Sequence, residues 1–273
     1  MMADKIGRRA RSLTAECRFY IDVLHLCRVY FSCSTLLAPV HDCFSRKLSN
    51  TLLVIAVALG LAAPAAAAEI TRTDLGMSGL PDTVAFLYKG PVAGGDLLNL
   101  QSQISALPAN TAVAIVLESP GGSLGEGIAL GQFFHRAKII SVVGPGGGCH
   151  SACSIAFLGG RNGRTGKPMR IKSSTGQLGF HQFSLGFDPN KKYIKKDRDD
   201  MVLAVQDITF ALVDYFKSID EDLTFLPFML RAPTEQIRLL SNEDAIASGI
   251  HVYNEQTKLL IDPSQIRQRV KAN

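Results

Sequence analysis

The chain has 273 residues, of which 47% are hydrophobic and 19% are charged, a composition that is ordinary for a globular protein with a sizeable core. The formal net charge is +5, but residues 1–68 hold 8 of the 29 Lys and Arg and 4 of the 24 Asp and Glu. The remaining 21 basic and 20 acidic side chains nearly cancel, so that part has no basic field to attract nucleic acid or an anionic membrane.

The N-terminal part of the chain has the layout of a secretory signal peptide. Arg46 and Lys47 precede an apolar run from Thr51 to Pro64, and a row of alanines follows. The pattern predicts a signal peptide over residues 46–68 that is cleaved after Ala68. The protein is then expected in the periplasm or outside the cell.

An uncleaved membrane anchor at residues 51–68 is the alternative, although an apolar run of this length is short beside the ~20 residues that a bilayer span needs. Residues 1–45 hold four of the six cysteines and do not resemble a signal peptide. We interpret them as an over-long gene start or a disordered extension. The predicted folded domain is residues 69–273.

The domain alternates between strand and helix patterns. In chain order, the predicted elements are a strand at 82–89, a helix at 96–107, a strand at 111–118, an amphipathic helix from Leu124, a strand at 138–143, a polar turn-rich loop at 161–170, a strand-like segment at 175–183, a long helix at 198–217, a short helix at 241–248 and a strand at 258–261. This alternation predicts an α/β fold with parallel strands and right-handed crossovers. Ligands collect at the carboxyl ends of such strands. The loops SPGG (119–122) and GPGGGCHSAC (144–153) both fall there, and we expect them to face each other.

These loops contain groups that serine-dependent acyl hydrolysis requires: a nucleophile and backbone donors for the oxyanion. Ser151 opens an apolar stretch, which predicts a helix N-terminus where Ala152 has a free N–H. Gly121 and Gly122 let the backbone approach a substrate carbonyl closely. His181, in a strand-like segment, is a candidate general base. Singly these residues are typical of a helix cap, a turn and a structural histidine, so their joint spacing carries the argument.

That spacing resembles the proteolytic subunit of Clp protease and the wider crotonase-like superfamily. The family has an SPGG turn before its nucleophilic serine, a glycine after the small-apolar helix that follows, and a later His-Gln pair. In this chain Gly122 precedes Ser151 by 29 residues, Ser151 precedes Gly160 by nine, and His181 and Gln182 supply the pair. The segment LLSNEDAIASGI at 239–250 is similar to the family's closing helix.

The resemblance covers residues 82–255 and implies a ClpP/crotonase-like spiral of ββα units with a parallel sheet. It implies these roles: Ser151 as nucleophile, His181 as base, and the N–H groups of Gly122 and Ala152, with Gly121 as an alternate, as the oxyanion hole. The family's catalytic aspartate falls on Ile237, which can neither orient nor stabilise an imidazolium. Glu235, two residues away, is the candidate third member.

Cys149 and Cys153 flank Ser151. In an oxidising compartment a disulfide between them is favoured, because Cα atoms four residues apart near a helix start lie within bridging range. Free buried thiols come second. A zinc site with His150 comes third, because it offers at most three ligands, so no metal is expected.

The leading hypothesis is therefore an exported ClpP-like serine peptidase that acts on peptides or unfolded segments, without cofactor and without an ATPase partner outside the cytoplasm. A ClpP-fold binding or scaffolding protein with weak or no activity is the alternative, favoured by Ile237. Acyl-coenzyme A chemistry on the crotonase fold is a third reading, which the predicted export disfavours. Related folds form rings or trimers through a helix that follows the base, so the helix at 198–217 predicts a homo-oligomer.

Overall fold

The computed structural model describes residues 67–265, except for residues 76, 78, 79, 81, 184, 186–189, 191, 222 and 234. Residues 63–273 form one compact unit of the chain. The extension at 1–45 and almost all of the predicted signal peptide, up to residue 66, lie outside the described residues. Within the described part, no helix has the length and apolarity that a membrane span requires.

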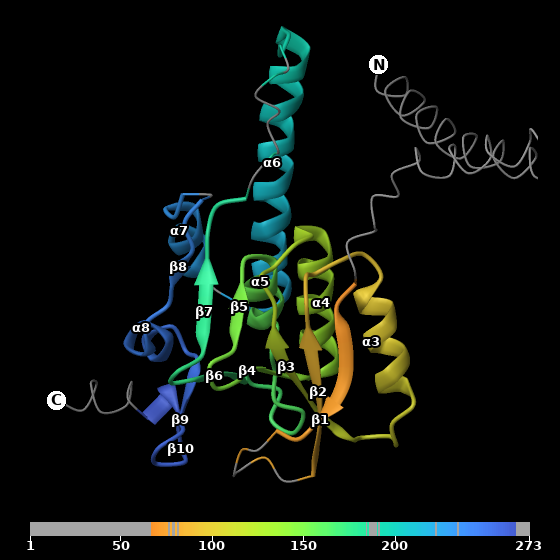
Figure 1. Cartoon of the computed structure of the whole chain (residues 1–273), viewed down its shortest axis with the longest axis vertical. Coiled ribbons are helices and arrows are strands. Elements are labelled where there is room, and N and C mark those ends of the chain that lie inside the picture. Colours follow the sequence, from red (N-terminus) through yellow and green to blue (C-terminus); the bar gives the residue numbers. More distant parts are fainter. Residues whose placement is uncertain are drawn as a thin grey trace, which may run out of the picture. The chain divides into compact units, whose positions relative to one another are not determined.

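A seven-stranded, mostly parallel sheet forms the centre of this unit (Figure 1). β1 is antiparallel to β2 and β10 is antiparallel to β9, and every pair between β2 and β9 is parallel. In spatial order its strands are β1 (Glu69–Thr73), β2 (Thr83–Lys89), β3 (Ala112–Glu118), β4 (Ile140–Val143), β6 (Arg170–Ser173), β9 (His251–Asn254) and β10 (Leu259–Ile261). The α/β class and the predicted mostly parallel sheet are confirmed.

The sheet is covered on both faces, as the continuous apolar run of β3 predicts. Val113, Ile115 and Leu117 belong to the larger core, whereas Ala114 belongs to a smaller one on the opposite face. Alternate strand residues point to opposite faces, so a strand without polar positions must have apolar cover on each side.

Six helices lie in the described residues. They are α3 (Asp96–Ser105), α4 (Leu124–Ala137), α5 (Ala152–Leu158), α6 (Lys195–Ser218), α7 (Phe225–Leu230) and α8 (Asn242–Ala247). α4 packs against α3, α5 and α6. It begins after Ser123, whose hydroxyl accepts a hydrogen bond from the Glu126 N–H, a regular N-cap. Because α4 follows the SPGG loop directly, this cap also fixes where that loop ends.

A second sheet of three short strands carries the loops around Ser151. Its strands are β5 (Gly148–His150), β7 (Gln177–Phe180) and β8 (Arg238–Leu239). β5 is parallel to β7, and β7 is antiparallel to β8. The chain therefore brings three distant segments together beside the start of α5.

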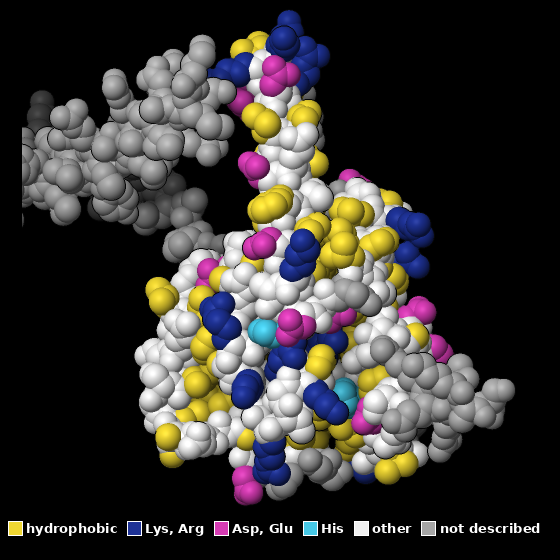
Figure 2. Space-filling view, turned by 180° about the vertical axis from the view of Figure 1, so that it is seen from behind, with side chains coloured by type: hydrophobic (Ala, Val, Ile, Leu, Met, Phe, Trp, Pro, Cys, Tyr) yellow, Lys and Arg dark blue, Asp and Glu magenta, His cyan; other side chains and the backbone are white. Residues whose placement is uncertain are grey.

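The long helix α6 has two unlike halves. Its C-terminal half buries Leu212, Tyr215 and Phe216, and the Tyr215 hydroxyl donates to the Ile155 carbonyl at 2.6 Å. Its N-terminal half extends beyond the sheet and the other helices of this unit (Figure 1) and has no buried residue. Apolar side chains, among them Val202 and Leu203, are exposed along this half (Figure 2).

The strand β6 corrects the prediction of a turn-rich loop that includes residue 170. Arg170 and Lys172 are buried in the middle of the sheet, where a sequence pattern does not lead one to expect charges. Each has partners: Arg170 forms an ion pair with the largely buried Glu221, and the Lys172 ammonium donates to Asn242 Oδ1 at 2.6 Å. Because these partners lie 51 and 70 residues away in the chain, local sequence does not reveal that the two buried groups have them.

Candidate functional site

Ser151 lies in a sharp turn between β5 and α5. Its backbone has φ 56° and ψ −124°, a left-handed conformation that costs a non-glycine residue about 1–3 kcal/mol. The Ser151 N–H donates to the Gly179 carbonyl at 3.0 Å, and the buried Ser154 hydroxyl donates to the carbonyls of Cys149 and Gly179. A strained strand-to-helix turn is the arrangement that exposes a nucleophilic serine hydroxyl. The predicted helix N-terminus is confirmed.

The SPGG loop lies directly against this turn, as predicted. The Ser119 N–H donates to the Gly148 carbonyl at 2.7 Å, and the His150 N–H donates to the Ser119 carbonyl at 3.0 Å. A Cβ atom on Gly121 would lie 2.6 Å from Ser151 Cβ, and one on Gly122 would lie 2.3 Å from the Val92 carbonyl oxygen. Neither contact is sterically allowed, so both positions require glycine.

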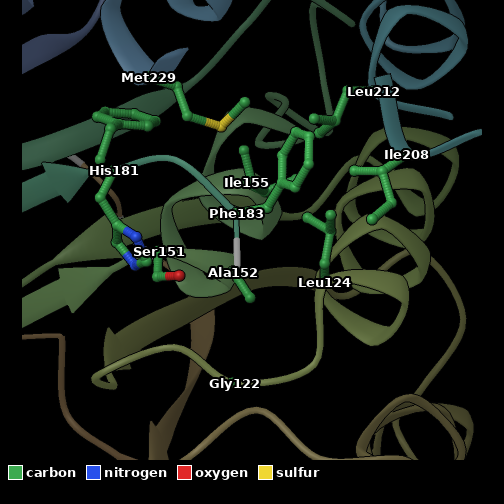
Figure 3. Close-up of a pocket in the computed structure, with 11 residues that line it drawn as sticks. Gly122, Leu124, Ser151, Ala152, Ile155, His181, Phe183, Ile208, Leu212 and Met229 are labelled. Carbon is green, nitrogen blue, oxygen red and sulfur yellow. The ribbon is translucent and has the colours of Figure 1, made fainter. Parts of the chain in front are cut away.

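Two backbone N–H groups beside Ser151 are free to bind an oxyanion. Among the described residues, the N–H groups of Gly122 and Ala152 have no hydrogen-bond acceptor, and both residues line the cavity at Ser151 (Figure 3). The Gly121 N–H differs because it donates to the Ser119 hydroxyl at 3.1 Å. The geometry thus favours the N–H groups of Gly122 and Ala152 as the donor pair. The N–H of the alternate, Gly121, already has an acceptor in the Ser119 hydroxyl.

His181 follows the last residue of β7, and its imidazole lies beside the Ser151 side chain (Figure 3). Its Nδ1 is 2.6 Å from the Gln182 carbonyl oxygen. Because a carbonyl can only accept, Nδ1 carries the proton and Nε2 is left as the acceptor, which is the tautomer that a general base needs. The Ser151 and His181 side chains form no hydrogen bond with each other in this structure, and such bonds are often long in a ligand-free site.

Gln182 is a positioning residue that the sequence did not reveal. Its N–H donates to the Ala232 carbonyl at 3.0 Å and its side-chain amide donates to the Leu230 carbonyl at 2.5 Å. These two bonds fix the carbonyl that holds the His181 ring. The role rests on a backbone oxygen, so residue type gives no signal for it.

The position at which the sequence resemblance would put a catalytic aspartate, Ile237, carries no acid. Phe180 is paired with Arg238 in the ladder between β7 and β8, and the next pair in this register would be His181 with Ile237. The Ile237 side chain packs beside Gly179. Glu235 is exposed and makes no hydrogen bond or ion pair with His181, so its role as third member stays a prediction.

His150 is a second residue near the site to which sequence reasoning gave no catalytic role. Its Nε2 is buried and has no hydrogen-bond partner among the described residues. Burial lowers the pKa of His150, and the nearby His181 lowers it further. His150 is therefore neutral near pH 7 and adds no charge beside the candidate base.

Cys149 and Cys153 form a disulfide, with their Cα atoms 5.3 Å apart. The predicted pairing is confirmed, and it removes the two thiolates that the zinc alternative needed. Across the described residues, no cluster of three or more His, Cys, Asp or Glu could hold a metal ion. The disulfide closes the chain on either side of Ser151 and so ties the end of β5 to the first turn of α5.

A cavity of about 280 Å³ opens beside the Ser151 hydroxyl (Figure 3). Apart from Ser151 and His181, its walls are glycine or apolar. They comprise Gly122, Leu124, Ala152, Ile155, Phe180, Phe183, Ile208, Leu212 and Met229. The apolar walls come from five parts of the fold, including α6 and α7, so a ligand there would contact side chains that are far apart in sequence.

Comparisons of the sequence with protein-family models and with curated proteins find no match.

Proposed function

We propose that this chain is an exported serine hydrolase of the ClpP-like type that cleaves peptide bonds through Ser151 and His181. The observation that carries the proposal is the convergence of four groups on one cavity: a strained serine, an imidazole with a free Nε2, and two unpaired N–H groups. The predicted family, its spiral of ββα units and the predicted secretion remain part of this proposal. They are supported by the SPGG, Ser151 and His181 spacing and by the disulfide.

In the proposed reaction, His181 Nε2 takes the Ser151 hydroxyl proton as the oxygen attacks the substrate carbonyl. The resulting oxyanion accepts hydrogen bonds from Gly122 and Ala152, and His181 then gives its proton to the leaving amine. Water hydrolyses the acyl-serine by the same route in reverse. Throughout, Nδ1–H stays hydrogen-bonded to the Gln182 carbonyl, which orients the ring.

The rate should be low. A neutral carbonyl orients an imidazole but stabilises an imidazolium less than a carboxylate does, and loss of the acid costs about 10⁴ in a well-studied triad enzyme. This same feature favours the second candidate function, a binding or scaffolding protein with the ClpP-like fold.

Acyl-enzyme formation distinguishes these two functions. We would incubate the protein with p-nitrophenyl hexanoate and follow both nitrophenolate release and intact mass. A hydrolase gains one hexanoyl group on Ser151, and Ser151→Ala gains none. Ser105→Ala, which changes an exposed serine of α3, is the matched control and should behave as wild type. A folded wild type that gains no acyl group would favour the binding function.

We also infer self-association through the part of α6 that precedes Leu212. Phe210 is 72% exposed, and Val202 and Leu203 are each 57% exposed, and no residue of α6 before Leu212 is buried. Exposed apolar residues in this number mark a contact surface. Light scattering at micromolar concentration should show an oligomer that Phe210→Ser weakens. A monomeric wild type would exclude self-association.

A further inference from the structure

Asp96 is a buried carboxylate at the first residue of α3. It is 1% exposed, and it accepts hydrogen bonds from three neutral donors: the Tyr88 hydroxyl, the Ala93 N–H at 2.8 Å and the Ala68 N–H at 3.2 Å. Among the described residues no Lys, Arg or His forms an ion pair with it. The N-terminus of α3 favours its negative charge, but a buried charge without a cation is costly.

Ala68 is built into the fold beside this carboxylate. Its side chain is 4% exposed in the larger core, and its Cα lies close to Gly90. Ala67, one residue earlier, is exposed. The peptide bond between Ala67 and Ala68 therefore marks the boundary between exposed chain and the buried core.

The alanine row admits more than one cleavage position. A signal peptidase needs small residues one and three positions before the cut, and both Ala65 with Ala67 and Ala66 with Ala68 meet that need. Cleavage after Ala68 would remove a core residue and a hydrogen bond to Asp96. Cleavage after Ala67 keeps both.

We propose that the leader is removed by hydrolysis of the Ala67–Ala68 peptide bond and that the new α-ammonium of Ala68 becomes the counter-ion of buried Asp96. Water supplies the hydroxyl that leaves with Ala67 as a carboxylate, and the Ala68 nitrogen keeps its hydrogen and gains two protons. A neutral amide donor to Asp96 is thereby replaced by a cation at the same place.

The same carboxylate is connected to the candidate oxyanion donors. Asp96 accepts a hydrogen bond from the Ala93 N–H. The residue before Ala93 is Val92, whose N–H donates to the Gly121 carbonyl at 2.9 Å. The Val92 carbonyl in turn accepts from the Ser123 N–H at 2.8 Å. Asp96 thus fixes the segment that holds both ends of the Gly121–Gly122 turn. Processing should make this turn more rigid.

The first test uses the whole 273-residue chain, exported from a bacterial host, with its N-terminus determined by mass spectrometry. The expected first residue is Ala68. A chain that starts at Glu69, or one that keeps residues before Ala68, would overturn the proposal.

The second test compares two chains that end at residue 273 and start at Ala68 or at Ala67, each released from a fusion without extra residues. All described core residues lie at or after Ala68, so both chains contain the whole core. At pH 7 the start at Ala68 should lower the unfolding equilibrium constant by about tenfold or more, as a buried ion pair replaces a neutral bond. Equal constants would contradict the pairing.

Asp96→Asn should remove the difference between the two starts. Should that variant not fold, Nα-acetylation of the Ala68 start gives the same comparison, since it replaces the ammonium with a neutral amide N–H, as in the unprocessed chain. Slower amide exchange at Val92 and Ser123 is expected for the Ala68 start, and equal exchange would contradict the link to the turn. None of these measurements of the N-terminus, of unfolding or of amide exchange depends on hydrolase activity.

The pH dependence has a definite sign. The carboxylate raises the ammonium pKa above its unfolded value of about 8, so the advantage of the Ala68 start is complete below that value and is lost as pH rises through the folded pKa. The titratable and charged groups around this pair are Tyr88, Lys89, Glu69 and Glu126, and both chains share them. An advantage that persists unchanged at pH 10 would contradict an ionic origin.

Discussion

At the scale of single residues, the candidate site differs from a complete triad at one point. The His181 ring is held by the Gln182 carbonyl instead of a carboxylate, and two further hydrogen bonds hold Gln182. Orientation and tautomer are thus provided, whereas stabilisation of the imidazolium by a negative charge is missing. A mutation that supplies a negative charge near His181 should therefore restore the missing stabilisation of the imidazolium.

Ile237→Asp should raise the rate of acylation at Ser151. It would put a carboxylate beside β7, in register with His181, at a position that is 45% exposed and tolerates a charge. Because an orienting acid is worth up to about 10⁴ in a triad enzyme, we expect at least a tenfold increase in ester hydrolysis. Ile237→Asn is the isosteric control and should give no increase. An unchanged rate for Ile237→Asp would mean that the missing charge does not limit the reaction.

Much of the site could be predicted at this scale, because its residues have side chains or glycines with a recognisable spacing. Ser151, His181 and the two glycines of the SPGG loop are brought together as expected. The roles of Gln182 and of Ser119, which occupies the Gly121 N–H, could not be predicted. Both depend on hydrogen bonds of particular atoms, which sequence patterns do not encode.

At the scale of elements, the contact of α4 with α5 holds Ala152 in place. A Cβ atom on Gly127 would lie 2.5 Å from the Ala152 carbonyl oxygen, whereas one on Gly125 would meet nothing within 4 Å. These two glycines lie in the same helix, two residues apart, and neither has a positive φ. Substitutions at these two positions therefore form a matched pair that tests the contact between α4 and α5.

Gly127→Ala should destabilise the fold by about 1–3 kcal/mol, because it overpacks the contact with α5. Gly125→Ala should stabilise it by up to about 1 kcal/mol, because alanine is the better helix former and the site is open. Equilibrium urea unfolding measures both values. Equal effects of the two substitutions would show that α4 and α5 do not approach this closely.

Elements with strong periodicity were predictable and the others were not. β2, β3, α3 and α6 lie within a few residues of their predicted bounds, because an apolar pattern specifies each of them. The polar run at 161–170 predicts a loop that includes Arg170, the first residue of β6, and the strands β5 and β8 are too short for any periodicity. Their formation depends on partners elsewhere in the fold.

At the scale of the whole molecule, stability should fall on acidification before the carboxylates titrate. Burial lowers the pKa of His135, His150 and His251 below the ordinary value of 6.5. As pH falls below 6.5 the unfolded chain takes up protons that the folded chain does not, so the free energy of unfolding decreases. Well above pH 7 these histidines are neutral in both states and no longer make the free energy of unfolding depend on pH.

Urea unfolding between pH 7.5 and pH 5.5 checks this expectation. Wild type should lose stability over this range, and the double variant His150→Gln with His251→Gln should lose less. If the double variant has the same slope as wild type, the two buried histidines are not the source of the acid sensitivity.

The α/β class of the whole molecule was predictable from alternation of strand and helix. What could not be predicted is how the fold uses the start of the domain. Ala68 was expected to leave with the signal peptide, yet it is a buried core residue that donates to Asp96. An alanine row has no internal signal for which of its members is buried.

The most direct test of the central claim is labelling of the purified protein with a fluorophosphonate probe, which reacts with activated serines. Wild type should become labelled, with the probe located on Ser151 by mass spectrometry, and Ser151→Ala and His181→Ala should remain unlabelled. A folded wild type that does not react, or a Ser151→Ala variant that still does, would contradict the assignment of Ser151 and His181 as a catalytic pair.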